Sequence, residues 1–403
     1  MRPFRIDIPE EALADLRSRL TNTRWPAQPA GTGWERGVPV DHLRDLAEYW
    51  RTGYDWRAAE ARLNRFPQFL TEIDGADVHF LHVRSPEPTA LPLLMTHGWP
   101  GSVAEFLDVI GPLADPRAHG SDPADAFHVV IPAPPGFGFS GPGRRSGWTV
   151  GRIAAAWAEL MGRLGYRRYA AHGTDLGVWI SLTLAGLAPD NLVGAHVNYL
   201  LTPPSGAPGE EETLDNADRE RLALMDEMGA KGAYLAIQST RPQTLAYGLT
   251  DSPVAQLAWI VEKFREWTDP TVPGGSVDRD QLLTNVSIYW LTATAGSAAQ
   301  LYFEMADQLP APGRVQPAPP PLPLPLAVMV HPHDLALPVR RLAAQRFPNI
   351  VQWSEFERGG HFPAMEEPEL FVADVRSFAR ALPGRSVRAA SRTVAMPTSE
   401  ESR

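Results

Sequence analysis

Cysteine is absent from this chain of 403 residues. Its absence excludes disulfide bonds, a thiolate nucleophile and any metal site built on cysteine. Basic residues are also scarce relative to acidic ones, with 37 Lys and Arg against 47 Asp and Glu and a formal net charge of −10. Because no basic stripe offsets this balance, we do not expect nucleic acid as a partner.

Long apolar runs are missing as well. The N-terminal residues M-R-P-F-R-I-D-I-P-E-E are charged and lack the apolar segment of a signal peptide. No apolar stretch approaches the roughly 20 residues that span a bilayer. We therefore expect a cytoplasmic protein without a membrane anchor. The 11 histidines form no H-E-x-x-H motif and show no other credible metal spacing, so we expect no metal and no other cofactor.

Two short motifs in the first half of the chain are misleading. Gly136, Gly138 and Gly141 match G-x-G-x-x-G, but a dinucleotide site needs a helix that opens directly at these glycines. Prolines stand on both sides, and the next helical pattern begins only near Thr149. Ser140 lacks the second glycine of a G-x-S-x-G nucleophile motif. We interpret both motifs as parts of a loop.

Strand-like and helical patterns alternate along most of the chain, which predicts an α/β fold. We expect a mostly parallel sheet with helices on both faces, a helical cap inserted into it and an appended N-terminal region. The predicted divisions are a helical or meandering appendage (1–68), the first half of the sheet domain (69–200), the cap (201–309), a proline-rich return segment (310–325), the second half of the sheet domain (326–383) and a disordered tail (384–403).

A-H-G-T-D-L-G, from residue 171 to residue 177, lies between a predicted strand and a predicted helix. Hydrolases of one large class present a nucleophilic serine in such a turn, but here the central residue is Asp175. Asp334 follows a later strand, and His361 lies in R-G-G-H-F. Nucleophile, acid and histidine in this order are typical of α/β-hydrolases, and all three are expected at the carboxyl ends of strands.

An aspartate in this position favours substitution at a saturated carbon. A serine that attacked such a carbon would form an ether, which water does not readily cleave, whereas an aspartate forms an ester, which water cleaves. The carboxyl group of Asp175 is expected to be ionised at neutral pH, since the reference pKa of aspartate is about 3.9. The attack therefore needs no base, and His361 is free to activate water for the second step. Asp334 would orient the imidazole of His361 and stabilise its charged form. The N–H groups of Trp99 and Leu176 are the expected oxyanion donors. The substrate is then an epoxide or an alkyl halide.

The two substrates differ in their leaving group. An epoxide oxygen needs an acidic O–H, whereas a halide needs N–H donors, often tryptophan indoles. The residue after Asp175 is Leu176 and not tryptophan, which argues against a halide site. The cap offers four tyrosines, among which these arguments do not choose: Tyr234, Tyr247, Tyr289 and Tyr302.

From Phe4 to about Leu382 the chain resembles the microsomal-type epoxide hydrolases, which are α/β-hydrolases with an extra N-terminal region. The resemblance is carried by F-R-I-D-I-P-E-E, T-R-W-P, Y-W-R-T-G-Y-D-W-R, H-G-W-P-G-S, P-G-F-G-F-S, Q-S-T-R-P-Q-T, L-L-T-N-V-S-I-Y-W and G-G-H-F-P-A-M-E-E-P. It implies Asp175 as nucleophile, His361 as base, Asp334 as the acid beside it and H-G-W-P as the oxyanion loop. It further implies Tyr234 and Tyr302 as the pair that holds and protonates the epoxide oxygen.

Two departures from the family pattern stand out. Many members have D-W-G at the nucleophile, where this chain has D-L-G, and mammalian members carry a membrane anchor before the appended region. The resemblance therefore implies a soluble, bacterial-type enzyme. We expect substrate contacts from His97, Trp99, Pro100 and Trp179.

The sequence thus predicts a cofactor-free epoxide hydrolase whose partners are a small-molecule epoxide and water. The alternatives are a haloalkane dehalogenase and a non-catalytic ligand-binding protein on the same fold. Some soluble relatives serve natural-product pathways, including enediyne biosynthesis, and such a role is one candidate here. The oligomeric state is open, with a homodimer as one candidate.

Overall fold

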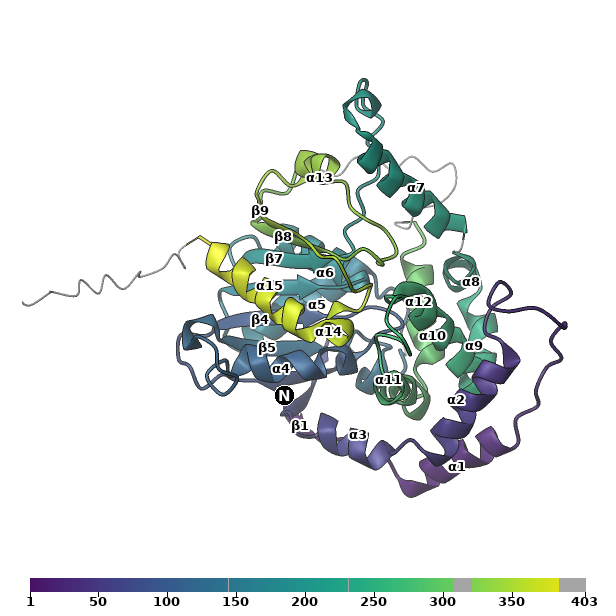
Figure 1. Cartoon of the computed structure of the whole chain (residues 1–403). Helices are drawn as coiled ribbons and strands as arrows, with labels where there is room; N and C mark the ends of the chain where they lie inside the picture. The colour runs from purple at the N-terminus through teal and green to yellow at the C-terminus, as the bar shows by residue number, and fades with distance from the viewer. Residues whose placement is uncertain (144, 231, 308–320, 384–403) are drawn as a thin grey trace, which may run out of the picture.

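The computed structural model describes residues 1–143, 145–230, 232–307 and 321–383 (Figure 1). The predicted tail and most of the proline-rich return segment lie outside these residues. No helix in the described part of the chain is long and apolar enough to cross a membrane.

In the described ranges, nine strands form one sheet at the centre of the molecule, in the order β1-β2-β3-β5-β4-β6-β7-β8-β9. The pairs β1–β2, β2–β3 and β3–β5 are antiparallel and the other five are parallel, so the prediction of a mostly parallel α/β sheet is confirmed. The strands are β1 (Arg2–Phe4), β2 (Gln68–Ile73), β3 (Ala76–Val83), β4 (Leu91–Thr96), β5 (Phe127–Pro132), β6 (Tyr169–Gly173), β7 (Leu192–Asn198), β8 (Leu326–Val330) and β9 (Ile350–Glu355).

Local sequence accounts for the hairpin between β2 and β3. Ile73 pairs with Ala76, so only Asp74 and Gly75 form the turn. Both have positive φ, 49° and 72°. A two-residue turn of this kind matches the twist of the strands, and Asp-Gly adopts it readily.

Helices cover both faces of the sheet (Figure 1). On one face lie α4 (Leu107–Ala114), α14 (Pro363–Glu366) and α15 (Pro368–Ala381), and on the other α5 (Val150–Arg163) and α6 (Leu176–Leu187); α13 (Arg340–Arg346) connects β8 and β9. The side chain of Thr149 caps α5 by accepting a hydrogen bond from the N–H of Arg152. Burial of the apolar faces of these helices against the strands is the main favourable contribution to this layered arrangement.

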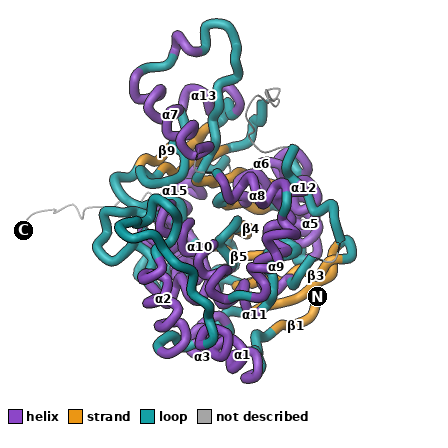
Figure 2. Tube along the Cα trace, turned by 90° about the vertical axis from the view of Figure 1, so that its right-hand side faces the viewer, coloured by secondary structure: helices purple, strands orange, loops and turns teal. Residues whose placement is uncertain are grey.

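Among the residues that the structure describes between β7 and β8, six α-helices interrupt the sheet domain. We call them the cap helices: α7 (Asn216–Ala230), α8 (Ala233–Thr240), α9 (Pro242–Asp251), α10 (Pro253–Trp267), α11 (Arg279–Leu291) and α12 (Ala295–Glu304). α11 starts with a capping box, in which Asp278 and Gln281 satisfy each other's backbone N–H groups. Figure 2 shows α8 to α12 gathered beside the sheet.

The N-terminal region reaches from the sheet edge to the cap. It comprises β1, which pairs with β2, and the helices α1 (Glu10–Thr21), α2 (Val40–Thr52) and α3 (Trp56–Leu63). Trp50 donates an indole N–H to Ser287 Oγ (2.9 Å), and the Tyr49 hydroxyl donates to Asp280 Oδ1 (2.8 Å). The apolar sides of α1 and α2 belong to the same buried cluster as α10 and α11. The region therefore packs against the cap as well as against the sheet.

Candidate active site

Asp175 lies in a tight turn between β6 and α6. Its φ of 51° is unusual for a residue other than glycine, and strain of this kind persists where the surroundings enforce it. A Cβ at Gly173 would collide with the backbone of Gly177, and one at Gly177 would collide with Thr96 on β4. These two glycines let the turn pack closely on the neighbouring strand, which fixes the direction of the Asp175 carboxylate.

His361 lies between two carboxylates. Its Nδ1–H donates to Asp334 Oδ1 at 2.7 Å, and its Nε2 lies 3.5 Å from Asp175 Oδ2. The imidazole is fully buried. Burial alone lowers the pKa of His361, but attraction to Asp334 and Asp175 outweighs it and raises this pKa to about 10. The imidazole is thus a cation at neutral pH as long as both carboxylates are ionised.

Loops at the carboxyl edge of the sheet bring these three residues together. Asp175 follows β6, Asp334 lies in the loop after β8, and His361 lies in the loop after β9. The N–H of His361 donates to the carbonyl of Trp267 at the end of α10, and its carbonyl accepts from Asn198 Nδ2 at the end of β7. The histidine is therefore held by both the cap and the sheet.

The oxyanion loop contacts the other Asp175 oxygen. The N–H of Trp99 donates to Asp175 Oδ1 at 3.0 Å. A side chain at Gly98 would collide with the Asp175 carboxylate, so the glycine permits this close approach. Leu176 is the first residue of α6, where a backbone N–H has no acceptor within the helix. The Trp99 N–H thus contacts the carboxylate, and the Leu176 N–H directly follows Asp175 in the chain.

Cap helix α11 holds the rest of this loop. Asn285 Nδ2 donates to the carbonyl of Pro100 (2.6 Å), and the Tyr289 hydroxyl donates to the carbonyl of Gly101 (2.7 Å). His97 is fully buried, with Nδ1 3.0 Å from the Gly98 carbonyl oxygen, and burial lowers the pKa of His97 to about 4. His97 is therefore neutral, and Tyr289 is engaged with the backbone.

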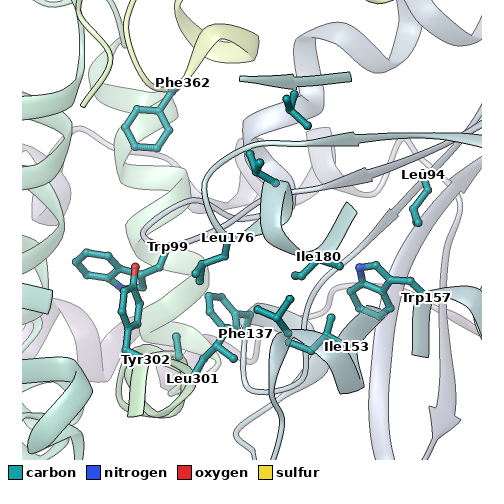
Figure 3. Close-up of a cluster of buried hydrophobic side chains, with 14 of the residues drawn as sticks. Leu94, Trp99, Phe137, Ile153, Trp157, Leu176, Ile180, Leu301, Tyr302 and Phe362 are labelled. Carbon is teal, nitrogen blue, oxygen red and sulfur yellow. The ribbon is translucent and has the colours of Figure 1, made fainter. Parts of the chain in front are cut away.

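Two cap tyrosines pack around Trp99. The ring of Tyr234, from α8, stacks on Trp99 at 5.4 Å, and the ring of Tyr302, from α12, meets it edge-on at 6.0 Å. Figure 3 shows Tyr302 beside Trp99, with Leu176 near both. Burial and the Asp175 charge raise the pKa of both tyrosines above the ordinary value. The phenols therefore stay protonated at neutral pH and are able to donate hydrogen bonds.

Other residues predicted from sequence have different positions. Tyr247, on α9, is 69% exposed. Trp179 follows Asp175 by one turn of α6 and is half-buried against the main apolar cluster. The structure thus places Tyr234 and Tyr302 against the oxyanion loop and Tyr247 at the surface. The chemical argument from sequence left this choice open, whereas the family resemblance implied the same pair.

Comparisons with known proteins agree on one family. The model of the epoxide hydrolase N terminus matches residues 1–106, and that of the alpha/beta hydrolase family matches residues 93–375. A curated protein of Stigmatella aurantiaca, provisionally named an epoxide hydrolase, is 47% identical over 382 residues, covering 94% of this chain and 85% of that protein. Epoxide hydrolase 1 of Sus scrofa is 33% identical and covers 94% and 88%. The chain belongs to the epoxide hydrolase family.

Solved structures of the epoxide hydrolase family agree with the fold. The Aspergillus niger epoxide hydrolase superposes with a TM-score of 0.82 at 32% identity, covering 94% of this chain and 96% of that one. The juvenile hormone epoxide hydrolase of Bombyx mori gives 0.81 at 30%, covering 94% and 93%. The α/β-hydrolase fold and the resemblance stated from sequence motifs are therefore confirmed, and the chain is a hydrolase of the class that acts on ether bonds.

Two aromatic residues beside His361 in this epoxide hydrolase, Tyr199 and Trp267, were not predicted from the sequence. Tyr199 follows β7 with a φ of 58°, and its ring lies 5.0 Å from that of His361. The Trp267 ring lies 5.2 Å from His361 on another side. Tyr199 could have been suspected from its place at the carboxyl edge of the sheet. Trp267 ends a cap helix and carries no local signal, since only tertiary packing brings it to the site.

Metal ligands are not grouped in the part of this epoxide hydrolase that the structure describes. Within those ranges, no three His, Asp or Glu side chains are arranged to hold a metal ion.

Proposed function

We propose that this protein opens an epoxide to a vicinal diol through a covalent alkyl ester on Asp175, with His361, Asp334, Tyr234 and Tyr302 as the other reacting groups. The observation that carries the proposal is the environment of one carboxylate: Oδ1 accepts from the Trp99 N–H, and Oδ2 lies 3.5 Å from His361 Nε2. The rings of two protonated phenols, Tyr234 and Tyr302, contact the ring of Trp99, the residue whose N–H binds this carboxylate.

In the first step, Asp175 Oδ2 attacks an epoxide carbon and the carbon–oxygen bond breaks. The electron pair goes to the epoxide oxygen, which takes a proton from one of the phenols. Burial and the charge of Asp175 raise the pKa of both phenols, so the phenols keep their protons until a strongly basic alkoxide develops on the epoxide oxygen. Esterification removes the negative charge of Asp175 and with it one of the two attractions that raise the pKa of His361. His361 then loses its proton, which restores the phenol.

In the second step, neutral His361 takes a proton from water, and the hydroxide adds to the ester carbon. The negative charge develops on Oδ1, which already faces the Trp99 N–H at 3.0 Å. One such donor typically changes a rate by about 10²–10³. Collapse of this intermediate breaks the bond to the alkyl oxygen, which leaves as the diol with the proton from His361. The new carboxyl group of Asp175 then gives its proton to His361, which restores the carboxylate and the imidazolium. Asp334 stabilises the imidazolium in the meantime.

Single-turnover reaction in ¹⁸O-water tests the covalent step. The label should enter the Asp175 carboxylate first and the diol only in later turnovers. Label that enters the diol in the first turnover would overturn the ester.

The His361→Gln variant tests the division of labour. It should be alkylated but not hydrolysed, so that the intact protein gains the mass of the substrate. His119→Gln, an exposed histidine far from the site in sequence, is the matched control and should turn over normally. Halide release from a chloroalkane by a wild-type protein inactive on epoxides would instead support a dehalogenase.

We further propose that the chain is divided into the N-terminal appendage, the two halves of the sheet domain and the cap. We also propose that His97, Trp99, Pro100 and Trp179 contact the substrate. A role in natural-product biosynthesis, a cytoplasmic location and a homodimer stay predictions.

A further inference from the structure

Lysine is rare in this chain. It stands only at positions 231 and 263, whereas arginine supplies nearly all other positive charges. Lys263, on α10, is 2% exposed. Its ammonium group contacts two carboxylates of the same helix, Glu262 Oε1 at 2.6 Å and Glu266 Oε2 at 2.8 Å. A buried ammonium held by its own helix in this way is a fixed point charge, unlike the mobile lysines of a protein surface.

The ammonium group lies over the rings of the candidate site. Lys263 Nζ is 4.9 Å from the ring centroid of Tyr234 and 5.9 Å from that of Trp267. Both distances fall in the range in which a cation is attracted by an aromatic face. The Tyr234 ring in turn stacks on Trp99, whose N–H contacts Asp175. A chain of contacts therefore connects the cation to the carboxylate.

We propose that Lys263 is a positioning residue for the ring-opening step: it fixes the Tyr234 ring and stabilises the negative charge that this phenol acquires when it gives its proton to the epoxide oxygen. The inference rests on the proposed function, since it needs Tyr234 as a proton donor. The inference also distinguishes the two phenols. Among the described residues, Lys263 is a cation in contact with the Tyr234 ring, whereas the ring of Tyr302 contacts the aromatic rings of Trp99 and Tyr234.

The groups around Tyr234 give the physical reason. Burial, the Asp175 carboxylate and the Glu266 carboxylate all raise the pKa of Tyr234 and so oppose loss of its proton. Tyr199 and Tyr302 are neutral phenols nearby. Lys263 is the positive group against this ring, and its attraction to the ring increases when the phenol becomes a phenolate. Removing the ammonium charge should therefore slow alkylation, while hydrolysis of the ester, which uses His361, is unaffected.

Lys263→Met removes the charge and keeps the length of the side chain. Rapid-mixing measurements with a styrene-type epoxide should show alkylation slowed by about 10- to 100-fold, with an unchanged rate of ester hydrolysis. Lys263→Arg, which keeps the charge, should recover to within about threefold of wild type. The matched control is Arg265→Met, two residues along the same helix, where the guanidinium lies 5.8 Å from the Trp34 ring. This control should alkylate at the wild-type rate.

A double-mutant cycle with Tyr234→Phe separates this role from general support of the fold. Lys263→Met should cause no further slowing in the Tyr234→Phe background. Equal loss in both backgrounds, or equal slowing of alkylation and hydrolysis, would overturn the inference.

If Lys263→Met does not fold, Lys263→Gln and Lys263→Arg provide the same comparison of neutral and charged side chains. Tyr234→Phe with normal activity would overturn the role of Tyr234 itself, whereas a slow Tyr234→Phe beside a normal Lys263→Met would overturn only the role of Lys263.

Discussion

The two halves of the candidate site are held by different forces. On the sheet side, hydrogen bonds and close backbone packing fix the charged groups, as the 2.7 Å contact between His361 and Asp334 illustrates. On the cap side, Tyr234 and Tyr302 are fixed by ring contacts with Trp99 and with each other. Neither of these two hydroxyls donates to a residue within the described ranges, whereas that of Tyr289 donates to a carbonyl.

The difference follows from what each half has to do. A carboxylate and an imidazole must be aimed, so directional hydrogen bonds suit them. A phenol that protonates a substrate must keep its O–H for that substrate, so non-directional ring packing holds the ring without engaging the hydroxyl. Tyr289 is as buried as Tyr302, but its O–H is engaged with the oxyanion loop, which makes it a structural residue.

The largest effect should come from the sheet half. Asp175→Ala removes the nucleophile, so no ester forms and turnover should fall by about 10⁴-fold or more. Single-turnover and steady-state assays on an epoxide measure the loss, and binding of the diol product tests that the variant is folded. Turnover within tenfold of wild type would assign the nucleophile to another residue.

The cap half should give smaller, step-specific effects. Tyr234→Phe and Tyr302→Phe each leave the ring packing intact and remove one O–H, so alkylation should slow by about 10- to 100-fold while ester hydrolysis is preserved. The double variant should be slower than either. Tyr247→Phe, on the exposed face of α9, is the control and should be unchanged. If Tyr247→Phe is as slow as Tyr302→Phe, the assignment of the cap phenols is wrong.

A pH effect should come from the loop between the two halves. Glu105, in the short 3₁₀ helix Val103–Phe106, is fully buried, and burial raises its pKa from 4.5 to about 8. A carboxyl group with a raised pKa in the folded state stabilises the fold below its unfolded pKa and loses that contribution as pH rises to about 8. Glu105→Gln mimics the neutral form.

Wild type should therefore lose stability relative to Glu105→Gln between pH 4.5 and pH 8, by an amount of the order of a few kcal/mol. Urea unfolding at several pH values gives the difference between the two proteins. Parallel stability curves would mean that the carboxyl group of Glu105 titrates at its ordinary pKa.

The smallest effect concerns how the cap is attached. Trp50→Phe removes the indole N–H that Ser287 Oγ accepts and leaves the ring volume largely filled, so the free energy of unfolding should fall by about 1–3 kcal/mol. Trp25→Phe, at a partly buried ring near Arg44, is the control. Denaturant midpoints measure both variants. An equal, small change in the two would show that the Trp50 contact contributes little to holding the cap.

Patterns within a few residues predicted much of this molecule. Alternating strand and helix signals predicted the α/β sheet, and the hairpin turn at Asp74 and Gly75 uses a residue pair that favours such turns. The order of Asp175, Asp334 and His361 at strand ends was sufficient to suggest that they meet, because parallel strands share a carboxyl edge. Such signals are local or follow from a general rule of topology.

Features that depend on distant packing were not predicted. β1 is three residues long and pairs with residues 68–70, too short a strand to recognise from its own sequence. β6 begins only at Tyr169, whereas Tyr166, three residues earlier, lies outside the strand with its hydroxyl 2.8 Å from His82 Nε2. Without the family resemblance, tertiary contacts alone would decide which cap tyrosines lie near Asp175, and the position of Lys263 against the Tyr234 ring has no sequence signal of its own.

The position of α2 against α11 also has a consequence for synthesis of the chain. Trp50 bonds to a residue 237 positions later, and Tyr49 to one 231 positions later. At roughly 5–20 residues per second, the ribosome needs on the order of 10 to 50 s to supply those partners. During that interval the apolar faces of α1 and α2 lack the cap surface that covers them in the finished fold. Helices α1 and α2 are thus made well before the cap helices and complete their packing only after them, and the nascent N-terminal region is a candidate for chaperone binding.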